Sequence, residues 1–269
     1  MRAIQSRVNR RAELRRVRSE IEGPAVGGMP QAAGALAFVA SPGTLQAGSR
    51  LYAVGDIHGQ AEKLLALHAA IAMDLQLRPA VSARLVYLGD YIDWGPDSAG
   101  VLAVLIGGGP GIPATYLIGD HEQMLLDALH GDGAAATDWL HSGGRETLAS
   151  WGMAPDAPRD GWAARIPAAQ LAFLRGLKLR YREGGYLFVH AGIRPGVKSA
   201  EQSRQDIQGI REPFLSTERH LGRVVVHGHT TVTAPVIRFN RIGIDTGAGL
   251  GGGLTAAVLE GDQIGFIRC

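Results

Sequence analysis

The sequence has 269 residues, of which 46% are hydrophobic and 19% charged, a length and composition that indicate one globular domain with a sizeable core. The only cysteine is Cys269, which excludes an intrachain disulfide and a thiolate zinc cluster, and we therefore expect a cytoplasmic protein. No apolar run reaches the roughly 18 residues that a membrane-spanning helix needs, so we expect no membrane span.

The formal charge of +2 is unevenly distributed along the chain. Residues 1–23 contain seven arginines and three glutamates, which leaves 20 of the 27 basic and 22 of the 25 acidic residues to positions 24–269. Apolar residues recur among these arginines at helical spacing, a pattern that also occurs in segments that bind nucleic acid or an anionic membrane. We interpret residues 1–49 as a flexible, solvated N-terminal extension instead, and we expect no nucleic-acid partner. The folded domain is predicted to span residues 50–269.

From residue 50 onward, short β-rich runs alternate with helical patterns, which is typical of a layered α/β fold. Residues 121–182 are predicted to be mostly helical, as a cap or insertion. Alternating strands in the C-terminal tail predict a second, antiparallel-leaning sheet, and the glycine-rich run 247–253 is expected to form a flexible turn. The other predicted strands are residues 50–54, 84–88, 114–118, 186–190 and 223–227, and the predicted crossover helices are residues 60–73 and 97–106.

Polar motifs follow five of the predicted strands. A single Gly-Asp after a strand is usually a turn, and a single histidine is usually a surface or packing residue. Five such motifs in one order favour a shared site, because strand ends converge at one edge of an α/β sheet. The motifs are GDIHG (55–59), GDYIDWG (89–95), GDHE (119–122), VHAG (189–192) and VHGHT (226–230).

Carboxylates and imidazoles gathered at one edge suit a pair of divalent metal ions. Two ions about 3.5–4 Å apart need a shared carboxylate and several nitrogen or oxygen donors on rigid supports. A mixed set of imidazoles and carboxylates suits manganese, iron or zinc better than magnesium or calcium. We therefore expect two divalent ions, with Mn²⁺ as the first candidate and iron or zinc as alternatives.

The five motifs resemble those of the phosphoprotein phosphatase family, binuclear metallophosphatases that include bacterial Ser/Thr phosphatases and the related diadenosine tetraphosphatases. The family pattern is GDxHG, GDxVDRG, GNHE, HAG or HGG, and then a metal-binding histidine. The resemblance covers about residues 50–250. It implies a calcineurin-like αββα sandwich, in which two mixed sheets are flanked by helices, and a metallophosphatase catalytic domain at residues 50–269.

The resemblance also implies a set of metal ligands, carried over position by position. In this pattern Asp90 would bridge the two metals, and His227 would be structural because it precedes the matching histidine. The first metal would be held by Asp56 and His58, and the second by Asp120, His190 and His229.

The same resemblance implies that His121 is a general acid and that Asp93 orients its imidazole. A water molecule activated between the two metals would attack phosphorus in line, while the leaving oxygen takes a proton from the opposite side. The pKa of histidine suits that donation, and a carboxylate partner raises it. Arg211 lies where bacterial relatives carry an arginine that binds phosphate, and Arg194 follows a metal ligand, so both are candidate substrate-binding residues.

Three positions depart from the family pattern: Trp94 and Ile118 each replace an arginine, and Asp120 replaces an asparagine. An arginine at position 94 would bind phosphate oxygens bidentately, whereas an indole offers one hydrogen bond or an aromatic face, so Trp94 is a third candidate substrate-binding residue. Asp120 can still coordinate metal, but its charge makes that metal a weaker Lewis acid. Both changes lower the expected rate on phosphomonoesters, since losing a charged transition-state contact commonly costs about 10²- to 10³-fold.

Three functions are compatible with these residues. The preferred one is a metal-dependent Ser/Thr or broad-specificity protein phosphatase of reduced activity, which acts on a phosphorylated protein or a small phosphoester. The second is a hydrolase of dinucleoside polyphosphates of the diadenosine tetraphosphate type, in which Trp94 holds a base. The third is a metal-binding pseudophosphatase scaffold, and the retained pair of Asp93 and His121 argues against it, because a scaffold needs no general acid.

Overall fold

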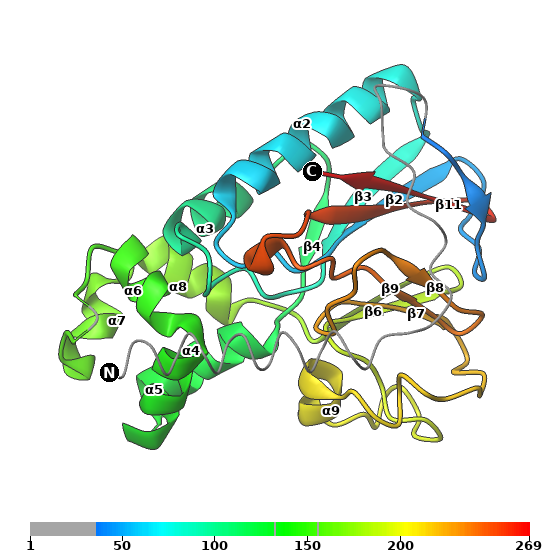
Figure 1. The fold of residues 1–269 in the computed structure, drawn as a ribbon. Coiled ribbons are helices and arrows are strands. Elements are labelled where there is room, and N and C mark those ends of the chain that lie inside the picture. The colour runs from blue at the N-terminus through cyan, green and yellow to red at the C-terminus, as the bar shows by residue number, and fades with distance from the viewer. Residues whose placement is uncertain (1–35, 132, 155) are drawn as a thin grey trace. The chain divides into compact units, whose positions relative to one another are not determined.

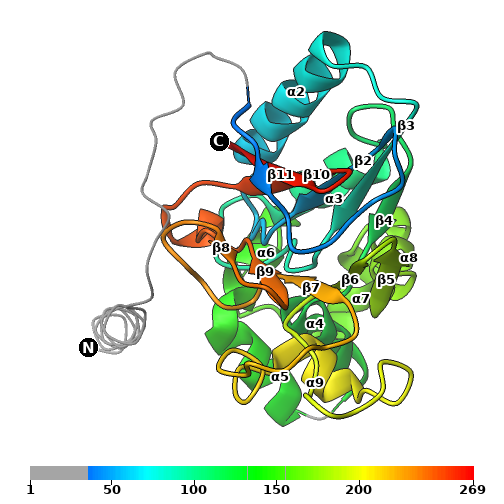
Figure 2. The same ribbon diagram turned by 90° about the vertical axis from the view of Figure 1, so that its right-hand side faces the viewer.

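Two stacked β-sheets form the centre of the computed structural model, which describes residues 36–131, 133–154 and 156–269 (Figure 1). A layer of helices covers the outer face of each sheet, so the order of layers is helix, sheet, sheet, helix (Figure 2). The expected αββα sandwich of two mixed sheets is thereby confirmed. Among the described residues, no helix combines the length and the apolarity that crossing a bilayer requires.

The first sheet has six strands in the order β1-β11-β10-β2-β3-β4. Its members are β1 (Val39–Ala40), β11 (Gln263–Arg268), β10 (Thr255–Glu260), β2 (Ser49–Val54), β3 (Ser82–Tyr87) and β4 (Ala114–Tyr116). The strands β2, β3 and β4 are parallel, joined by the crossover helices α2 (Ala61–Leu77) and α3 (Ser98–Ile106). The side chain of Asp97 caps α3 by accepting a hydrogen bond from the backbone N–H of Gly100.

The second sheet has five strands in the order β5-β6-β7-β9-β8. They are β5 (Arg180–Glu183), β6 (Tyr186–Val189), β7 (Val224–His227), β9 (Arg241–Gly243) and β8 (Val236–Ile237). The inner strands β6, β7 and β9 are parallel to one another, and only the two edge strands pair antiparallel.

The prediction of a second, antiparallel-leaning sheet in the C-terminal tail is therefore correct only for β8 and β9, which pair antiparallel in the second sheet. The hairpin of β10 and β11 joins the first sheet, where β10 pairs antiparallel with β2. Alternation along this hairpin points Ala257, Leu259 and Ile264 into the layer between the sheets. A period of two shows that a strand has a buried face but does not say which neighbour covers it, so the pattern alone could not assign the hairpin to a sheet.

Three buried clusters fill the spaces between the layers. Leu51, Val86, Phe188 and Val226 belong to the cluster between the two sheets, and the alternate residues of β2 and β3 face the cluster beneath α2 and α3. A third cluster packs α9 (Arg204–Gly209) against the outer face of the second sheet. Burial on both faces explains why the parallel strands read as near-continuous apolar runs.

Residues 121–182 form a mostly helical group, as predicted, which lies at one end of the sheets (Figure 1). Its last part, Arg180–Glu183, is not helical but forms the edge strand β5. The run 247–253 contains a short 3-10 turn, Ala248–Leu250. The helices of the group are α4 (Asp120–His130), α5 (Gly133–Trp139), a π turn (Leu140–Gly144), α6 (Arg145–Ser150), a 3-10 turn (Arg159–Gly161), α7 (Trp162–Arg165) and α8 (Ala168–Arg175).

The N-terminal extension predicted for residues 1–49 lies outside the described residues up to position 35. In the described part, β1 pairs with β11, and Leu45 is buried in the cluster between the sheets. The ring of Phe38 lies 4.7 Å from the guanidinium of Arg78 at the end of α2.

A buried ionic network fastens the start of β2 to the end of α2. Asp74 accepts hydrogen bonds from the Tyr52 hydroxyl at 2.6 Å and from two nitrogens of Arg78 at 2.8 Å, and it lies 3.4 Å from Arg50. Arg50, 3% exposed, also donates to Glu260 on β10. Arg50 thus links Asp74 of α2 to Glu260 of β10, so that the network joins three elements.

We predict that Asp74→Ala lowers the free energy of unfolding by about 3 kcal/mol, because it leaves the buried Arg50 and Tyr52 without their shared acceptor. Urea denaturation of the variant and the wild type measures this loss. The matched control is Asp127→Ala at an exposed aspartate of α4, for which a change within about 0.5 kcal/mol is expected. Equal stability of the two variants would contradict the role assigned to the network.

Candidate metal centre and active site

All six predicted metal ligands lie at the carboxyl ends of parallel strands. The strands β2, β3 and β4 run parallel in one sheet, and β6 and β7 do so in the other, so their ends meet at one edge of the sandwich. Asp56 and His58 follow β2, Asp90 follows β3, Asp120 begins α4 just after β4, His190 follows β6, and His229 follows β7.

Four of these side chains form a tight group, in which one possible ligand atom from each of Asp90, Asp120, His190 and His229 lies within 4.8 Å of the others. His190 Nε2 is 2.9 Å from Asp120 Oδ1 and 3.4 Å from Asp90 Oδ1. His229 Nδ1 is 3.0 Å from the same Asp120 oxygen. His190 Nδ1 donates to the Leu88 carbonyl, which orients the ring so that Nε2 faces the carboxylates.

A second group, made of His58, Asp90 and His121, lies on the other side of Asp90. His58 Nδ1 donates to the Ile92 carbonyl at 2.9 Å, and His58 Nε2 is 3.3 Å from Asp90 Oδ2. Asp90 therefore stands between His58 and His190, each facing a different carboxylate oxygen. This is the geometry that a bridging ligand needs.

Asp56 adds a carboxylate to this edge without joining either of those two tight groups. Its Oδ2 accepts a hydrogen bond from the backbone N–H of His229 at 2.8 Å. Its Oδ1 is buried and, among the described residues, has no hydrogen-bond partner, and the same holds for His229 Nε2. Buried polar atoms without partners are costly unless a water molecule or an ion satisfies them.

The pKa values of the carboxylates are strongly shifted by burial and by neighbouring charged groups. Burial and the neighbouring Asp245 raise the pKa of Asp56 well above its usual value. Burial alone would also raise the pKa of Asp90, but the adjacent His190 lowers it to about 2. For Asp120, hydrogen bonds from His190 and His229 overcome the effect of burial and lower the pKa. An anionic, buried set of oxygen and nitrogen donors fits divalent transition metals.

The backbone is strained where it carries these side chains. Among the described residues, the non-glycine residues with positive φ are His58, Asp90, Asp93, Trp94 and His229, and all of them belong to this edge. The left-handed region is disfavoured for L-residues, most of all for bulky ones such as Trp94 at φ 63°. Strain gathered at one place in this way is typical of functional sites.

Two glycines allow the carboxylates to approach the backbone. A Cβ on Gly119 would fall 2.0 Å from Asp90 Oδ1, and one on Gly228 would fall 1.9 Å from Asp56 Oδ1. Any side chain at either position would displace the carboxylate, which explains the Gly-Asp and His-Gly-His spacing of the motifs.

Glu122, to which the sequence assigned no role, fixes the loop that carries Asp90. Its carboxylate is fully buried and accepts hydrogen bonds from four backbone N–H groups, those of Asp90, Tyr91, Ile92 and Gly119, at 2.7–3.2 Å. Burial and the nearby charge of Asp90 raise its pKa to about 7. The final residue of the GDHE motif was the available signal, because a carboxylate three residues after a helix start often binds backbone amides.

The predicted acid pair is assembled in the structure. His121 Nδ1 donates to Asp93 Oδ2 at 2.7 Å, and Asp93 is completely buried. Burial would lower the pKa of His121, but the charges of Asp90 and Asp93 outweigh it and raise the pKa to about 10. Because Nδ1 is bonded to Asp93, Nε2 is the remaining ring nitrogen that can carry a proton.

Trp94 lies directly against these histidines. Its half-buried indole stacks on His58, with ring centroids 4.1 Å apart and planes inclined by 28°, and it meets His121 edge-to-face at 4.8 Å. One face of the indole is therefore covered by an imidazole. Any contact with substrate must use the remaining face or the ring edge.

The two candidate arginines differ in their surroundings. Arg194 forms a bidentate ion pair with Asp206, with nitrogen–oxygen distances of 3.0 and 2.6 Å. The side chain of Arg211 is exposed, just after α9. His227 is buried against Phe214, and burial lowers its pKa to about 3, which suits a structural residue.

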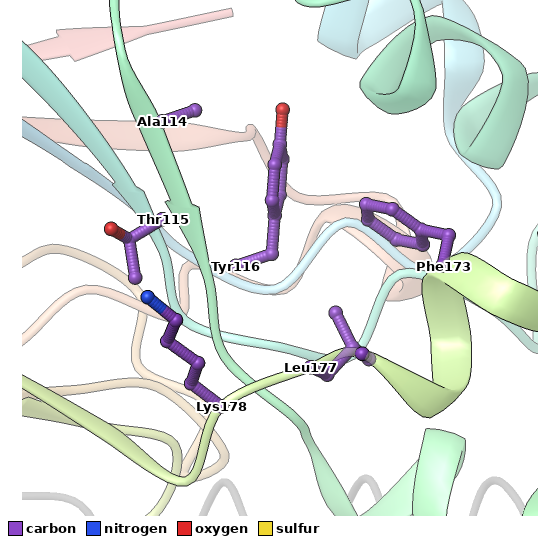
Figure 3. Close-up of a pocket in the computed structure, with 7 residues that line it drawn as sticks. Ala114, Thr115, Tyr116, Phe173, Leu177 and Lys178 are labelled. Carbon is purple, nitrogen blue, oxygen red and sulfur yellow. The ribbon is translucent and has the colours of Figure 1, made fainter.

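A small pocket lies elsewhere, beside the edge strand β4 (Figure 3). It is lined by Ala114, Thr115, Tyr116, Phe173, Gly176, Leu177 and Lys178. None of these seven is an acid or a histidine, so the pocket lacks the donors that the strand ends provide.

A sandwich of two mixed sheets with clustered aspartates and histidines at the strand ends defines a metal-dependent phosphoesterase. The chain belongs to the calcineurin-like phosphoesterase family, whose profile matches residues 49–251. This class of enzyme uses divalent metals, and the chain accordingly is a metal-dependent phosphatase with candidate ligands in place.

The two relatives described next are named for different activities. The chain is 30% identical to serine/threonine-protein phosphatase 1 of Salmonella typhimurium, over 78% of this chain and 92% of the relative. It is 28% identical to the asymmetrical bis(5'-nucleosyl)-tetraphosphatase of Anoxybacillus flavithermus, over 76% of this chain and 87% of the relative. Among solved structures, one provisionally named a diadenosine tetraphosphatase aligns with a TM-score of 0.60 at 24% identity, covering 81% of this chain and 93% of the other, a likeness of fold.

We predict that Glu122→Gln destabilises the protein by about 2–4 kcal/mol, because the amide nitrogen faces backbone N–H groups that then lack an acceptor. The displaced Asp90 loop should also weaken metal binding, by about 10- to 100-fold. Thermal unfolding and Mn²⁺ titration calorimetry measure the two effects. The control is Glu146→Gln at an exposed glutamate of α6, and unchanged metal affinity in Glu122→Gln would rule out the proposed support of Asp90.

Proposed function

We propose that the protein is a Ser/Thr or broad-specificity protein phosphatase that hydrolyses phosphomonoesters with two divalent metal ions, Mn²⁺ being the first candidate. The observation that carries the proposal is the buried pair of His121 and Asp93 beside the metal ligands, since a protonated imidazole suits an alkoxide leaving group. The similarity to a Ser/Thr phosphatase over 92% of that relative supports the same substrate class. The lone, terminal cysteine supports a cytoplasmic location.

The ligand assignment combines the two groups around Asp90 with the motif position of Asp56, which lies outside both groups. Asp56, His58 and Asp90 would hold one metal, and Asp90, Asp120, His190 and His229 would hold the other. When bound, such ions neutralise phosphate charge and supply an activated water molecule as the nucleophile. The protein's own contribution is to hold these donors rigidly and to exclude bulk water from the buried carboxylates.

His121 provides the proton that the leaving group needs. As the bond from water to phosphorus forms and the bond from phosphorus to the substrate oxygen breaks, Nε2 of His121 transfers its proton to that oxygen. Asp93 accepts a hydrogen bond from Nδ1 and thereby fixes the orientation of the imidazole, and its negative charge stabilises the protonated ring. The leaving group departs as a neutral alcohol, such as the hydroxyl of serine or threonine.

In the proposed enzyme, the phosphate would be bound by the metal ions and by few cationic side chains. Trp94 cannot form the bidentate contact that an arginine offers at this position, and Arg194 is already paired with Asp206. Arg211, exposed just after α9, is the candidate that would bind the phosphate. We expect a slow phosphatase for this reason.

A second function, hydrolysis of dinucleoside polyphosphates, is favoured by one specific feature. Trp94 brings an aromatic ring to the metal centre, where a nucleobase can stack on a surface that His58 leaves uncovered. The similarity to an asymmetrical bis(5'-nucleosyl)-tetraphosphatase supports this alternative.

A substrate panel separates the two functions. With Mn²⁺ bound, we predict a kcat/KM on a phosphoserine peptide at least about tenfold above that on diadenosine tetraphosphate, with p-nitrophenyl phosphate also hydrolysed. Asp90→Asn, which removes the bridging charge, serves as the inactive control. The reverse preference would replace the first function by the second, and no turnover by the metal-loaded protein would indicate a binding scaffold.

We further predict that Trp94→Arg raises kcat/KM on phosphomonoesters at least about tenfold, because the guanidinium contacts phosphate oxygens in the transition state. Steady-state kinetics on p-nitrophenyl phosphate measure the gain. Trp94→Phe keeps an aromatic ring but adds no charge, so it should give no increase. If the arginine variant is no faster, or the phenylalanine variant is equally fast, position 94 does not limit phosphate binding.

A further inference from the structure

Three residues of the helical insertion recur every four positions and all reach the same dipeptide. Trp139 lies at the end of α5 and Thr147 in α6, on either side of a kink in the π turn where Gly143 has a non-helical φ of 107°. Each contacts Asp93 or Trp94, the pair that follows Asp90 in the chain. We call these three residues the clamp face.

Two members of the clamp face donate hydrogen bonds to the carboxylate of Asp93, one to each oxygen. Trp139 Nε1 donates to Oδ2 at 2.9 Å, the oxygen that also accepts from His121, and Thr147 Oγ1 donates to Oδ1 at 2.6 Å. Thr147 Oγ1 in turn accepts from the backbone N–H of Asp93 at 2.9 Å and lies 2.9 Å from the hydroxyl of Ser98. Trp139, Thr147 and Asp93 are all completely buried, so none of these bonds is shared with bulk water.

The third member, Gly143, leaves room for the indole of Trp94 because it has no side chain. Its φ of 107° is inaccessible to most residues, and a Cβ there would fall 2.3 Å from Trp94 Cδ1. A Cβ on Gly249 would be 3.2 Å from Trp94 Cε3 and 2.6 Å from His58 Cβ. Two glycines from distant parts of the chain thus leave room for the indole where it stacks on His58.

We infer that the clamp face is the positioning device of the proton donor. Trp139 and Thr147 hold Asp93 in one orientation, so that the imidazole of His121 keeps Nδ1 on the carboxylate and presents Nε2 to the leaving oxygen. A carboxylate with only one donor could rotate and take the imidazole with it, which would misalign the proton transfer. This inference rests on the general-acid role proposed for His121.

A purely structural role makes a different prediction. Trp139 also packs against Trp162, at 5.5 Å between ring centroids, so its loss would weaken the fold in any case. Loss of folding or of metal binding lowers the rate on every substrate alike. Loss of positioned proton donation lowers the rate only where the leaving group is basic enough to need the proton.

The test compares Trp139→Phe and Thr147→Val with the wild type on substrates that differ only in leaving group. On a phosphoserine peptide and on a simple alkyl phosphate, kcat should fall about 10- to 100-fold, part of what a general acid contributes. On 2,4-dinitrophenyl phosphate, whose leaving group needs no proton, the loss should stay below about threefold. Thr147→Ser keeps the hydroxyl and should restore the wild-type selectivity.

Matched controls keep the outcomes distinct. Trp151→Phe removes another indole hydrogen bond of the insertion, to Gln170, without touching Asp93, and should show no dependence on the leaving group. His121→Gln sets the full size of the effect. If His121→Gln shows no leaving-group bias, the proposed function of His121 fails; if it does and both clamp variants do not, the clamp inference alone is overturned.

A readout independent of turnover completes the test. The proton shared by His121 Nδ1 and Asp93 should give a low-field ¹H NMR resonance in the wild type and in Thr147→Ser. It should broaden or shift upfield in Trp139→Phe and Thr147→Val, while both variants remain folded at the assay temperature and their Mn²⁺ affinity stays unchanged. An unaltered resonance in both variants would contradict the clamp even if none of the esters were turned over.

Discussion

Repulsion among carboxylates is the constraint on which the arrangement of this edge depends. Asp56, Asp90 and Asp120 converge at the ends of three parallel strands, and two of them are almost completely buried. Bringing such charges together is costly unless cations and hydrogen-bond donors compensate them. Imidazoles from the second sheet and backbone N–H groups provide part of that compensation, and the divalent metals that this family uses would provide the rest. Both sheets must therefore be present before the site exists.

The same constraint accounts for the local backbone. Glycines at 119 and 228 give the carboxylates room, and left-handed conformations at His58, Asp90 and His229 turn the side chains inward. Glu122 then binds the loop of Asp90 to the start of α4 through four backbone amides. Each unfavourable conformation persists because buried contacts around it leave no alternative.

The dipeptide of Asp93 and Trp94 contains the residues proposed for two functions of the site. Asp93 binds His121, the proposed proton donor, whereas Trp94 stands where relatives are expected to place a phosphate-binding arginine, and the helical insertion contacts both. A change in the insertion would therefore affect the proton donor and the phosphate site together. Under the proposed function, this coupling would give the insertion a chemical role beyond covering the sheet.

The sequence by itself was sufficient for the fold class, for most strands and helices and for the clustering of the ligand motifs, because strand periodicity and Gly-Asp or His-Gly turns are local signals. It was not sufficient for the pairing of the β10–β11 hairpin with β2, for the bonds of Glu122 to Asp90, Tyr91 and Ile92, or for the contacts of Trp139, Gly143 and Thr147 with Asp93 and Trp94. Those contacts join residues about 30 to more than 200 positions apart, and no local pattern specifies which apolar face or which buried donor will meet. Only the packing of the layers decided them.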